Sequence, residues 1–308
     1  MGDRQGDDDL LEALPDPRTL LHKYDLWPRK SLGQNFLVDP SAPDRIADCA
    51  DLSSDDTVLE VGAGLGTLTA SLAARAARVI AVETDPKLAA VLETELGQVG
   101  RIEIVHGDIL ELDPAAMLGA PLGVDRAGAT PAVPSCPLWG PRLPHYHVVA
   151  NLPYYITGAV VQHLLEASVR PIRMTLTVQL EVAQRMAAQP GEMSLLAVST
   201  QFYGTPRICM RLKRGAFYPV PQVSSAVLRL DLYDEPPVPV DDVAQFFEVV
   251  KAGFAQRRKQ LRNTLAATLQ LDPTDVEAAL QRHRIDHHRR AETLAIPEWG
   301  QVYAALSP

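Results

Sequence analysis

The chain is poor in the residues that build metal sites and disulfide frameworks. Its 308 residues include three cysteines, Cys49, Cys136 and Cys209, which lie far apart and form no Cys-x-x-Cys pair. His287 and His288 are adjacent, so on a helix their side chains diverge by roughly 100° and chelate a metal poorly. Neither arrangement has the ligand spacing of a zinc site. We therefore expect ordinary thiols and no metal cofactor.

Long apolar runs are missing as well. No run approaches the ~18 residues that a membrane-spanning helix needs. The first residues, MGDRQGDDDLLEALPDP, are acidic and lack the basic-then-apolar order of a signal peptide. The sequence predicts a flexible acidic leader over residues 1–21, a cytoplasmic location without a membrane partner, and a monomer.

Positive charge is scarce overall but unevenly distributed. A formal net charge of -9 argues against a nucleic-acid partner when it is averaged over the whole chain. Residues 205–290, however, contain 14 Lys and Arg against 10 Asp and Glu, whereas the rest of the chain contains 15 against 28. Because a phosphate backbone responds to the local field, this distribution favours a basic surface within residues 205–290.

From Thr57 onward, short apolar runs alternate with helical stretches. The runs that predict buried strands are TVLEVGAG, RVIAVETD, RIEIVHGD, HYHVVANLPYY and RMTLTVQL. Segments between them, such as TLTASLAARA and PKLAAVLETEL, carry apolar residues at helical spacing. This order predicts an α/β fold with a Rossmann-like, mostly parallel sheet covered by helices on both faces. Ligands of such sheets bind beyond the carboxyl ends of the strands, where the polar residues of these runs fall.

Two segments interrupt the alternation. Residues 113–144 are rich in Pro and Gly and predict a long surface loop, which is more typical of an inserted segment than of a functional element. DEPPVPVDD follows a last predicted strand, AVLRL, and has the composition of a linker. Helical patterns follow it. We therefore expect one α/β domain over residues 22–232 and a small all-α domain over residues 238–308.

The first predicted strand ends in a glycine-rich turn, EVGAGLG, over residues 60–66. Dinucleotide sites use the spacing G-x-G-x-x-G to place a pyrophosphate at a helix N-terminus. Here the spacing is G-x-G-x-G, with Glu60 two residues before Gly62 and with Gly64 following. This arrangement suits a ligand that has no phosphate but has a cationic amino-acid part, as S-adenosylmethionine does. A tight turn with a purely structural role is the alternative.

Acids also end the next two predicted strands. Glu83 lies 19 residues beyond Gly64, where a carboxylate can accept both hydroxyls of a ribose. Asp108, in HGDIL, can accept the exocyclic amine of an adenine ring. Each acid alone is more often a capping or solvated residue. Acids at three successive strand ends favour an adenosine-shaped cleft, so Glu60, Gly62, Gly64, Glu83 and Asp108 are candidate cofactor-binding residues.

These motifs resemble those of the ribosomal RNA adenine dimethylase family, over roughly residues 22 to 305. The motifs that carry the resemblance are RKSLGQNFL, LEVGAGLGTLT, VIAVETD, GDIL, NLPYYIT, QLEVAQR, FYPVPQVSS and AGFAQRRKQLRNTL. The resemblance implies a class I S-adenosylmethionine-dependent methyltransferase that releases S-adenosylhomocysteine. It also implies that Asn35 and Leu37 close over the cofactor and that Asn151 lines the same cleft. The acidic leader and the long segment before His145 depart from the family pattern.

The family resemblance further implies a target. That target is two adjacent adenosines near the 3′ end of small-subunit (16S-type) rRNA, which are dimethylated at N6 during maturation of the small ribosomal subunit. The expected partners are therefore small-subunit rRNA and the immature small subunit.

The motif NLPYYIT, residues 151–157, contains no acid, base or nucleophile. Adenine N6 is a poor nucleophile because its lone pair is delocalised into the ring. Acceptors on its two N–H groups would direct that lone pair at the methyl group. The Asn151 side-chain oxygen can be one acceptor and the Leu152 carbonyl the other, because Pro153 restricts Leu152 to an extended conformation.

Tyr154 of the same motif can stack on a flipped-out base, and Phe217 offers a second ring. Catalysis would then depend on orientation and electrostatics, and the proton would leave after methyl transfer, so no base is needed. A strand end followed by a proline turn and core tyrosines is the structural alternative.

Three basic clusters favour a structured RNA that is contacted through its phosphates. The first precedes FYPVP, the second is predicted to lie on a helix, and the third lies near residue 285. Their members are Arg207, Arg211, Lys213 and Arg214; Arg257, Arg258, Lys259 and Arg262; and Arg282, Arg284, Arg289 and Arg290.

Two other functions fit the same motifs. One is a large-subunit rRNA adenine methyltransferase of the macrolide-resistance type, and the other is a non-catalytic nucleic-acid-binding factor of the same fold. A methyltransferase acting on small molecules is less favoured, because it leaves the basic clusters unexplained.

Overall fold

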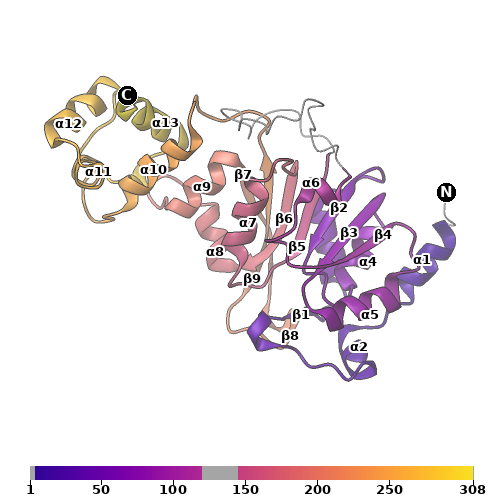
Figure 1. Ribbon diagram of the computed structural model, residues 1–308. Coiled ribbons are helices and arrows are strands. Elements are labelled where there is room, and N and C mark those ends of the chain that lie inside the picture. The colour runs from indigo at the N-terminus through magenta and orange to yellow at the C-terminus, as the bar shows by residue number, and fades with distance from the viewer. Residues whose placement is uncertain (1–3, 120–144, 308) are drawn as a thin grey trace. The chain divides into compact units, whose positions relative to one another are not determined.

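The computed structural model describes residues 4–119 and 145–307 (Figure 1). The strands are β1 Phe36–Leu37, β2 Thr57–Val61, β3 Arg78–Glu83, β4 Ile102–His106, β5 His147–Asn151, β6 Arg173–Gln179, β7 Gly204–Leu212, β8 Phe217–Tyr218 and β9 Ser225–Leu232. The α-helices are α1 Arg4–Glu12, α2 Pro17–Lys23, α3 Ala42–Ala50, α4 Thr67–Ala73, α5 Pro86–Leu96, α6 Pro114–Met117, α7 Thr157–Leu165, α8 Leu180–Met186, α9 Leu195–Tyr203, α10 Val243–Phe254, α11 Leu261–Leu269, α12 Pro273–Arg282 and α13 Ile296–Leu306. Short 3-10 helices cover Lys30–Leu32, Arg214–Ala216 and Ala291–Thr293.

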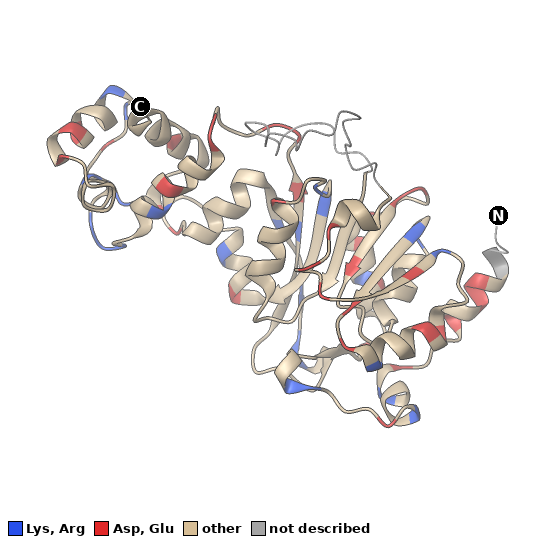
Figure 2. Ribbon diagram, viewed as in Figure 1, with Lys and Arg blue, Asp and Glu red and all other residues tan. Residues whose placement is uncertain are grey.

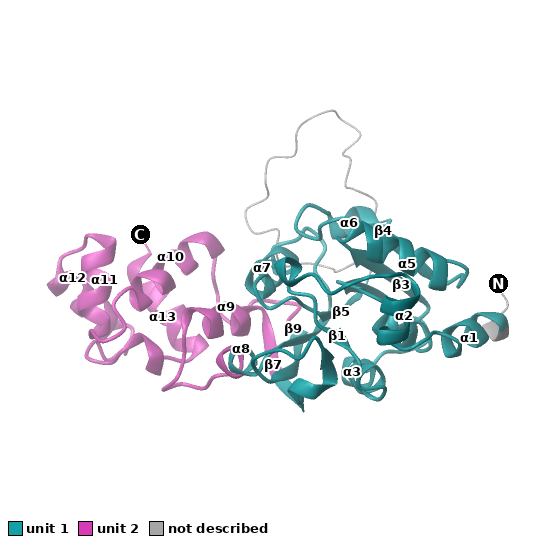
Figure 3. Cartoon of the chain, turned by 90° about the horizontal axis from the view of Figure 1, so that it is seen from below, with its two compact units in different colours: residues 1–126, 142–183, 207–232 teal, residues 127–141, 184–206, 233–308 magenta. Residues whose placement is uncertain are grey.

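The described residues fall into two compact units (Figure 3). The first holds residues up to 183 together with residues 207–232, and the second holds residues 184–206 and 233 onward. None of the helices in the described parts of the chain is long and apolar enough to cross a membrane.

The first unit is built on a seven-stranded sheet with the order β4-β3-β2-β5-β6-β9-β7. Strands β4, β3, β2, β5 and β6 are parallel, whereas β9 runs antiparallel to β6. The strand order reverses at β2, which is where sheets of this kind bind ligands. The predicted α/β fold, with a mostly parallel sheet and a helical C-terminal region, is confirmed. All five strands expected between residues 57 and 179 are present.

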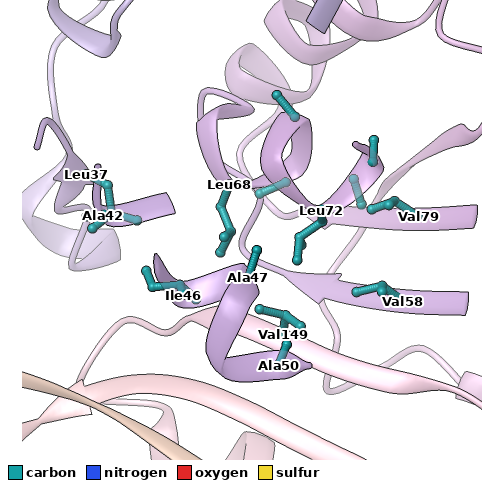
Figure 4. Close-up of a cluster of buried hydrophobic side chains, with 14 of the residues drawn as sticks. Leu37, Ala42, Ile46, Ala47, Ala50, Val58, Leu68, Leu72, Val79 and Val149 are labelled. Carbon is teal, nitrogen blue, oxygen red and sulfur yellow. The ribbon is translucent and has the colours of Figure 1, made fainter. Parts of the chain in front are cut away.

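A hydrophobic core fixes the glycine-rich turn to the sheet (Figure 4). Leu68 and Leu72, one helical turn apart on α4, are buried together with Ile46 of α3 and Val58 and Val79 of the sheet. Burial of each such side chain contributes about 1.5–3 kcal/mol, so the helix start after the turn is well anchored.

Gly66 lets this helix begin where it does. Its φ is 84°, and a Cβ built there would lie 2.6 Å from Leu96 Cδ1 on α5. The backbone conformation therefore requires glycine, and a side chain here would also have to displace the Leu96 methyl group.

The N-terminal residues differ from the prediction of a flexible leader. Residues 4–12 form helix α1, which packs on α4, and α2 follows. Asp7 and Asp8 form ion pairs with Arg101, and Leu11 is buried in the main core. The acidic composition did not indicate this helix, because its carboxylates form ion pairs with Arg101, which is distant in the sequence.

Strand β7 was not predicted as a strand, since its sequence was interpreted only as a basic cluster. The predicted loop over residues 113–144 begins with Asp113, which caps α6. Residues 120–144 of that loop lie outside the described residues.

The helical unit includes more than residues 238–308. Helix α9 packs on α10 and α13, and Phe202 of α9 stacks on Phe246 of α10 with a centroid separation of 4.7 Å. Tyr203 and Phe247 extend this aromatic contact, with their ring centroids 6.1 Å apart. Because α9 buries its aromatic residues against α10, it belongs with the helices that follow the linker.

Candidate active site

The candidate site is a cleft at the carboxyl ends of β2, β3, β4 and β5, and it encloses about 960 Å³ including its solvent-filled mouth. The segment from Leu32 to Leu37 lies along one wall. Eleven of the residues predicted for cofactor binding or catalysis line it: Asn35, Leu37, Glu60, Gly62, Gly64, Glu83, Asp108, Asn151, Leu152, Pro153 and Tyr154.

The cleft is lined by acids rather than by cations. Its lining includes the carboxyl groups of Glu60, Glu83 and Asp108, and none of the described side chains that line it is a Lys, Arg or His. Such a cleft is complementary to a cation and unfavourable for a phosphate group. Within residues 4–119 and 145–307, no group of three or more His, Cys, Asp or Glu is arranged to hold a metal ion.

Glu60 is the most unusual of the three acids. It is only 1% exposed, and neither of its carboxyl oxygens has a hydrogen-bond partner among the described residues. Burial raises the pKa of Glu60 to about 8. The Thr69 hydroxyl lowers this pKa, and the charge of Glu83 raises it. A ligand cation beside the cleft would lower this pKa and ionise the carboxyl, so Glu60 is a fitting group for the cationic part of a ligand.

Glu83 supports the glycine-rich turn as well as facing the cleft. Its Oε2 accepts a 2.8 Å hydrogen bond from the Gly64 N–H, and its Oε1 accepts one of 2.8 Å from the Asp85 N–H. Burial raises the pKa of Glu83, and these backbone hydrogen bonds counteract the increase. Each carboxylate oxygen can accept a second hydrogen bond, so a ligand hydroxyl can share the group. Asp108 is exposed and caps the following turn through the Leu110 N–H.

The motif RKSLGQNFL is tied to the cleft by an acid that sequence reasoning missed. Asp85 is buried, and its Oδ2 lies 3.1 Å from Gln34 Nε2 and 3.3 Å from Arg29 Nη1. The Gln34 side chain also accepts a hydrogen bond from the Arg29 N–H at 2.8 Å. The signal for Asp85 was an acid directly before Pro86, but that pattern predicts only a helix cap.

Asn151 is the last residue of β5, and its side chain is fixed from across the cleft. Its Nδ2 donates a 3.0 Å hydrogen bond to the backbone carbonyl of Asn35. Because the amide nitrogen is used in this way, Oδ1 is the acceptor atom that the side chain offers to a ligand. Sequence reasoning placed both residues at the cleft but could not foresee this bond between them.

Tyr154 is held at its outer end. Its phenol oxygen lies 2.7 Å from the hydroxyl of Ser225, the first residue of β9. The neighbouring Tyr155 is 65% exposed and packs against Gly33, where a built Cβ would lie 3.1 Å from the ring. The NLPYYIT turn is therefore in contact with the segment that precedes β1.

Phe217 does not occupy the position predicted for it. It is 1% exposed, belongs to the main hydrophobic core and is absent from the described residues that line the cleft. Strand β8 pairs with β1, which places Phe217 opposite Leu37. The ring packs in the core and offers no face to a base in this structure, so a second stacking ring at Phe217 stays a prediction.

The first basic cluster is exposed. Arg207 and Arg211 lie on β7, and Lys213 and Arg214 follow it (Figure 2). Arg214 Nε donates a 2.7 Å hydrogen bond to the Pro221 carbonyl, which leaves its side chain at the surface beside the FYPVPQVSS segment.

The second cluster is divided by the structure. Arg257, Arg258 and Lys259 are exposed in the turn between α10 and α11, not on a helix as predicted (Figure 2). Arg262, on α11, instead forms an ion pair with Glu277 of α12.

The third cluster is divided in the same way. Arg289 forms an ion pair with Glu298, and Arg290 lies 3.9 Å from Glu292. Arg282 and Arg284 are exposed. The basic surface is therefore smaller than the count of Lys and Arg indicated.

Comparison with known proteins agrees with the geometry of the cleft. A family profile described as ribosomal RNA adenine dimethylase matches residues 27–307. A Dehalococcoides mccartyi protein called ribosomal RNA small subunit methyltransferase A is 41% identical over 282 residues, which cover 92% of this chain and 89% of the relative. A protein of the same name from Anaeromyxobacter sp. (strain K) is 42% identical over 299 residues, 96% of this chain and 100% of the relative.

The crystal structure of the 23S rRNA methyltransferase ErmE superposes with a TM-score of 0.67 at 29% identity, over 89% of this chain and 100% of that one. The profile match spans both units and all the motifs that line the cleft. The chain belongs to the ribosomal RNA adenine dimethylase family.

Proposed function

We propose that this protein uses S-adenosylmethionine to dimethylate N6 of two adjacent adenosines near the 3′ end of small-subunit rRNA. The observation that carries the proposal is the cleft itself, in which three acids, and no Lys, Arg or His of the described lining, lie beside an asparagine whose amide is already oriented. Relatives about 40% identical over more than nine-tenths of the chain are named as small-subunit rRNA methyltransferases, which supports the same activity.

Each acid of the cleft is assigned to one part of the cofactor. The buried carboxyl of Glu60 would hold the cationic amino-acid part beside the turn that contains Gly62 and Gly64. Glu83 would accept the ribose hydroxyls, and Asp108 would accept the adenine amine. When bound, S-adenosylmethionine supplies an electrophilic methyl group on a sulfonium.

The chain's own residues would then orient the target adenine. Asn151 Oδ1 and the Leu152 carbonyl accept the two N6–H groups, which directs the nitrogen lone pair toward the methyl group. Tyr154 supplies a ring face for the flipped base. The transferred methyl makes N6 cationic and acidic, so water can take its proton afterwards. Such catalysis depends on preorganised acceptors rather than on a general base.

The exposed cations outside the cleft indicate that the macromolecular partner is an RNA. We assign Arg207, Arg211, Lys213 and Arg214 of the first unit, and the turn at residues 257–259 of the second, to phosphate contacts with structured RNA. The immature small subunit is the proposed physiological form of the substrate, with a monomeric enzyme acting in the cytoplasm.

A second activity has one observation in its favour. The 23S rRNA methyltransferase ErmE shares the fold at 29% identity. The higher identity of about 40% to small-subunit enzymes disfavours this alternative.

Transfer of labelled methyl groups to isolated substrates tests the proposal. Undermethylated small subunits, free small-subunit rRNA and large-subunit rRNA are each incubated with enzyme and labelled S-adenosylmethionine, and the nucleosides are then analysed. We expect N6,N6-dimethyladenosine in small-subunit RNA at two adjacent positions. Label confined to large-subunit RNA, or no label in any substrate, would overturn the proposal.

A further inference from the structure

The FYPVPQVSS segment, residues 217–225, contributes none of the described residues that line the cleft. Both of its ends nevertheless contact residues that line the active-site cleft. At one end, β8 pairs with β1, and the Val38 N–H donates a 2.8 Å hydrogen bond to the Ala216 carbonyl. At the other end, the Ser225 hydroxyl lies 2.7 Å from the Tyr154 phenol oxygen. The segment thus braces the wall that holds Asn35 and, separately, the tyrosine of NLPYYIT.

Ser225 is firmly placed. It is 0% exposed, it is the first residue of β9, and it lies opposite Gln179 in the antiparallel pairing of β9 with β6. The adjacent Leu180 N–H donates a 2.9 Å hydrogen bond to the Ser224 carbonyl, which closes the ladder at this end. Because the β9–β6 pairing holds the Ser225 backbone in place, the hydrogen bond of its hydroxyl restricts the position of the Tyr154 phenol.

Tyr154 is less firmly placed by its own surroundings. It follows the strand end at Asn151, lies on a turn and is only half-buried. Rotation about its χ1 would carry the ring away from the cleft, and the hydrogen bond at the ring tip opposes that rotation. Burial raises the pKa of the Tyr154 phenol, so both hydroxyls are uncharged at neutral pH and either can donate in this bond.

We propose that Ser225 is a positioning residue that holds the Tyr154 ring at the angle required for the flipped adenine. The inference depends on the proposed function, because it assumes that Tyr154 receives the base. A ring that is preorganised in this way loses less conformational freedom when the base arrives, which favours RNA turnover without changing cofactor affinity.

The test removes the hydrogen bond from each side in turn. Ser225→Ala deletes the buried hydroxyl, and Tyr154→Phe deletes the phenol while it keeps the ring. We expect each to lower kcat/KM for RNA by roughly 3- to 10-fold, as for the loss of one neutral hydrogen bond. The double variant should be no worse than either single variant, because both remove the same bond. Ser224→Ala, an exposed neighbour, is the matched control and should behave like wild type.

Two further measurements separate positioning from general stability. The dissociation constant for S-adenosylmethionine should be unchanged in both variants. An RNA carrying 2-aminopurine at the target position should show weaker stacking quenching with Ser225→Ala than with wild type. Additive losses in the double variant, or weakened cofactor binding in Ser225→Ala, would overturn the inference. If wild type itself methylates no small-subunit RNA, the proposed function fails instead.

Discussion

The cleft and the basic surface were both inferred from residue types, but strand register positions the cleft residues and does not position the basic ones. The cleft residues lie at the ends of β2, β3, β4 and β5, and the register of parallel strands brings them together, with Glu60 level with Val149 and Glu83 level with His106. The cations of the helical unit are not positioned by a strand register. There, Arg262 and Arg289 are each paired with an acid from another part of the chain.

The difference shows what a charge pattern can and cannot establish. A polar residue at a strand end faces a ligand site because the sheet decides its direction. A basic residue on a helix faces whichever acid packs beside it, so the net charge of a segment overstates the cations that remain available.

The largest effect should come from the acceptor in the cleft. Asn151→Ala removes Oδ1, which is proposed to accept an N6–H, and also the donor to Asn35. We expect kcat to fall by about 10³-fold, since loss of one preorganised polar group at a reacting centre has effects of this size. The Kd for RNA should change little, because the proposed phosphate contacts lie elsewhere. Single-turnover methylation and filter binding measure the two quantities.

Asn151→Asp provides the comparison for that variant. It keeps acceptor oxygens at the same position but loses the amide hydrogens that Asn35 accepts, so it should retain more activity than Asn151→Ala. Turnover close to wild type in Asn151→Ala would refute the role assigned to the carboxamide.

Much of this site could be predicted because its parts are local in sequence. Each of four local motifs predicts a strand end: EVGAGLG, VETD, HGD and NLPYY. The alternation of strands and helices predicts one parallel sheet. What could not be predicted are contacts between distant segments. The bond from Asn151 to Asn35, the tie of Asp85 to Gln34 and the burial of Phe217 all depend on how β1 and β8 pack, and no local pattern encodes that packing.

The second prediction concerns the unpartnered acid of the cleft. The pKa of Glu60 is raised from 4.5 to about 8 in the folded protein. The protonated form is therefore favoured by folding, and this contribution to stability is complete below pH ~4.3 and is lost as the pH rises through about 8. Wild type should lose roughly 2–3 kcal/mol of unfolding free energy from this group between pH 6 and pH 9.

Glu60→Gln keeps the shape of the side chain and removes its titration. Urea unfolding of both proteins at pH 6 and pH 9 isolates the group, because the other titrations are shared. The stability of the variant relative to wild type should increase at the higher pH. An identical pH dependence in the two proteins would show that Glu60 is not held protonated.

The third prediction tests the exposed cations of the helical unit. Replacement of Arg257, Arg258 and Lys259 by Gln should lower RNA affinity by roughly 10- to 30-fold at low salt. The slope of log affinity against log salt should become shallower by about 2–3, as expected when three phosphate contacts are lost. Cofactor affinity, measured by calorimetry, serves as the control and should not change. An unaltered salt slope would exclude this turn from the RNA contact.

The smallest effect should come from Arg262, which the sequence grouped with that turn. Its guanidinium is paired with Glu277, and His287 Nε2 lies 3.5 Å from the same acid. Arg262→Gln should change RNA affinity by less than about threefold, and the thermal midpoint should fall by about 2 °C or less, because a partly exposed ion pair contributes little. Arg258→Gln, a single change in the exposed turn, is the matched comparison and should weaken RNA binding more. The opposite ranking would mean that the ion pair opens when RNA binds, and paired cations of this unit would then have to be counted as available.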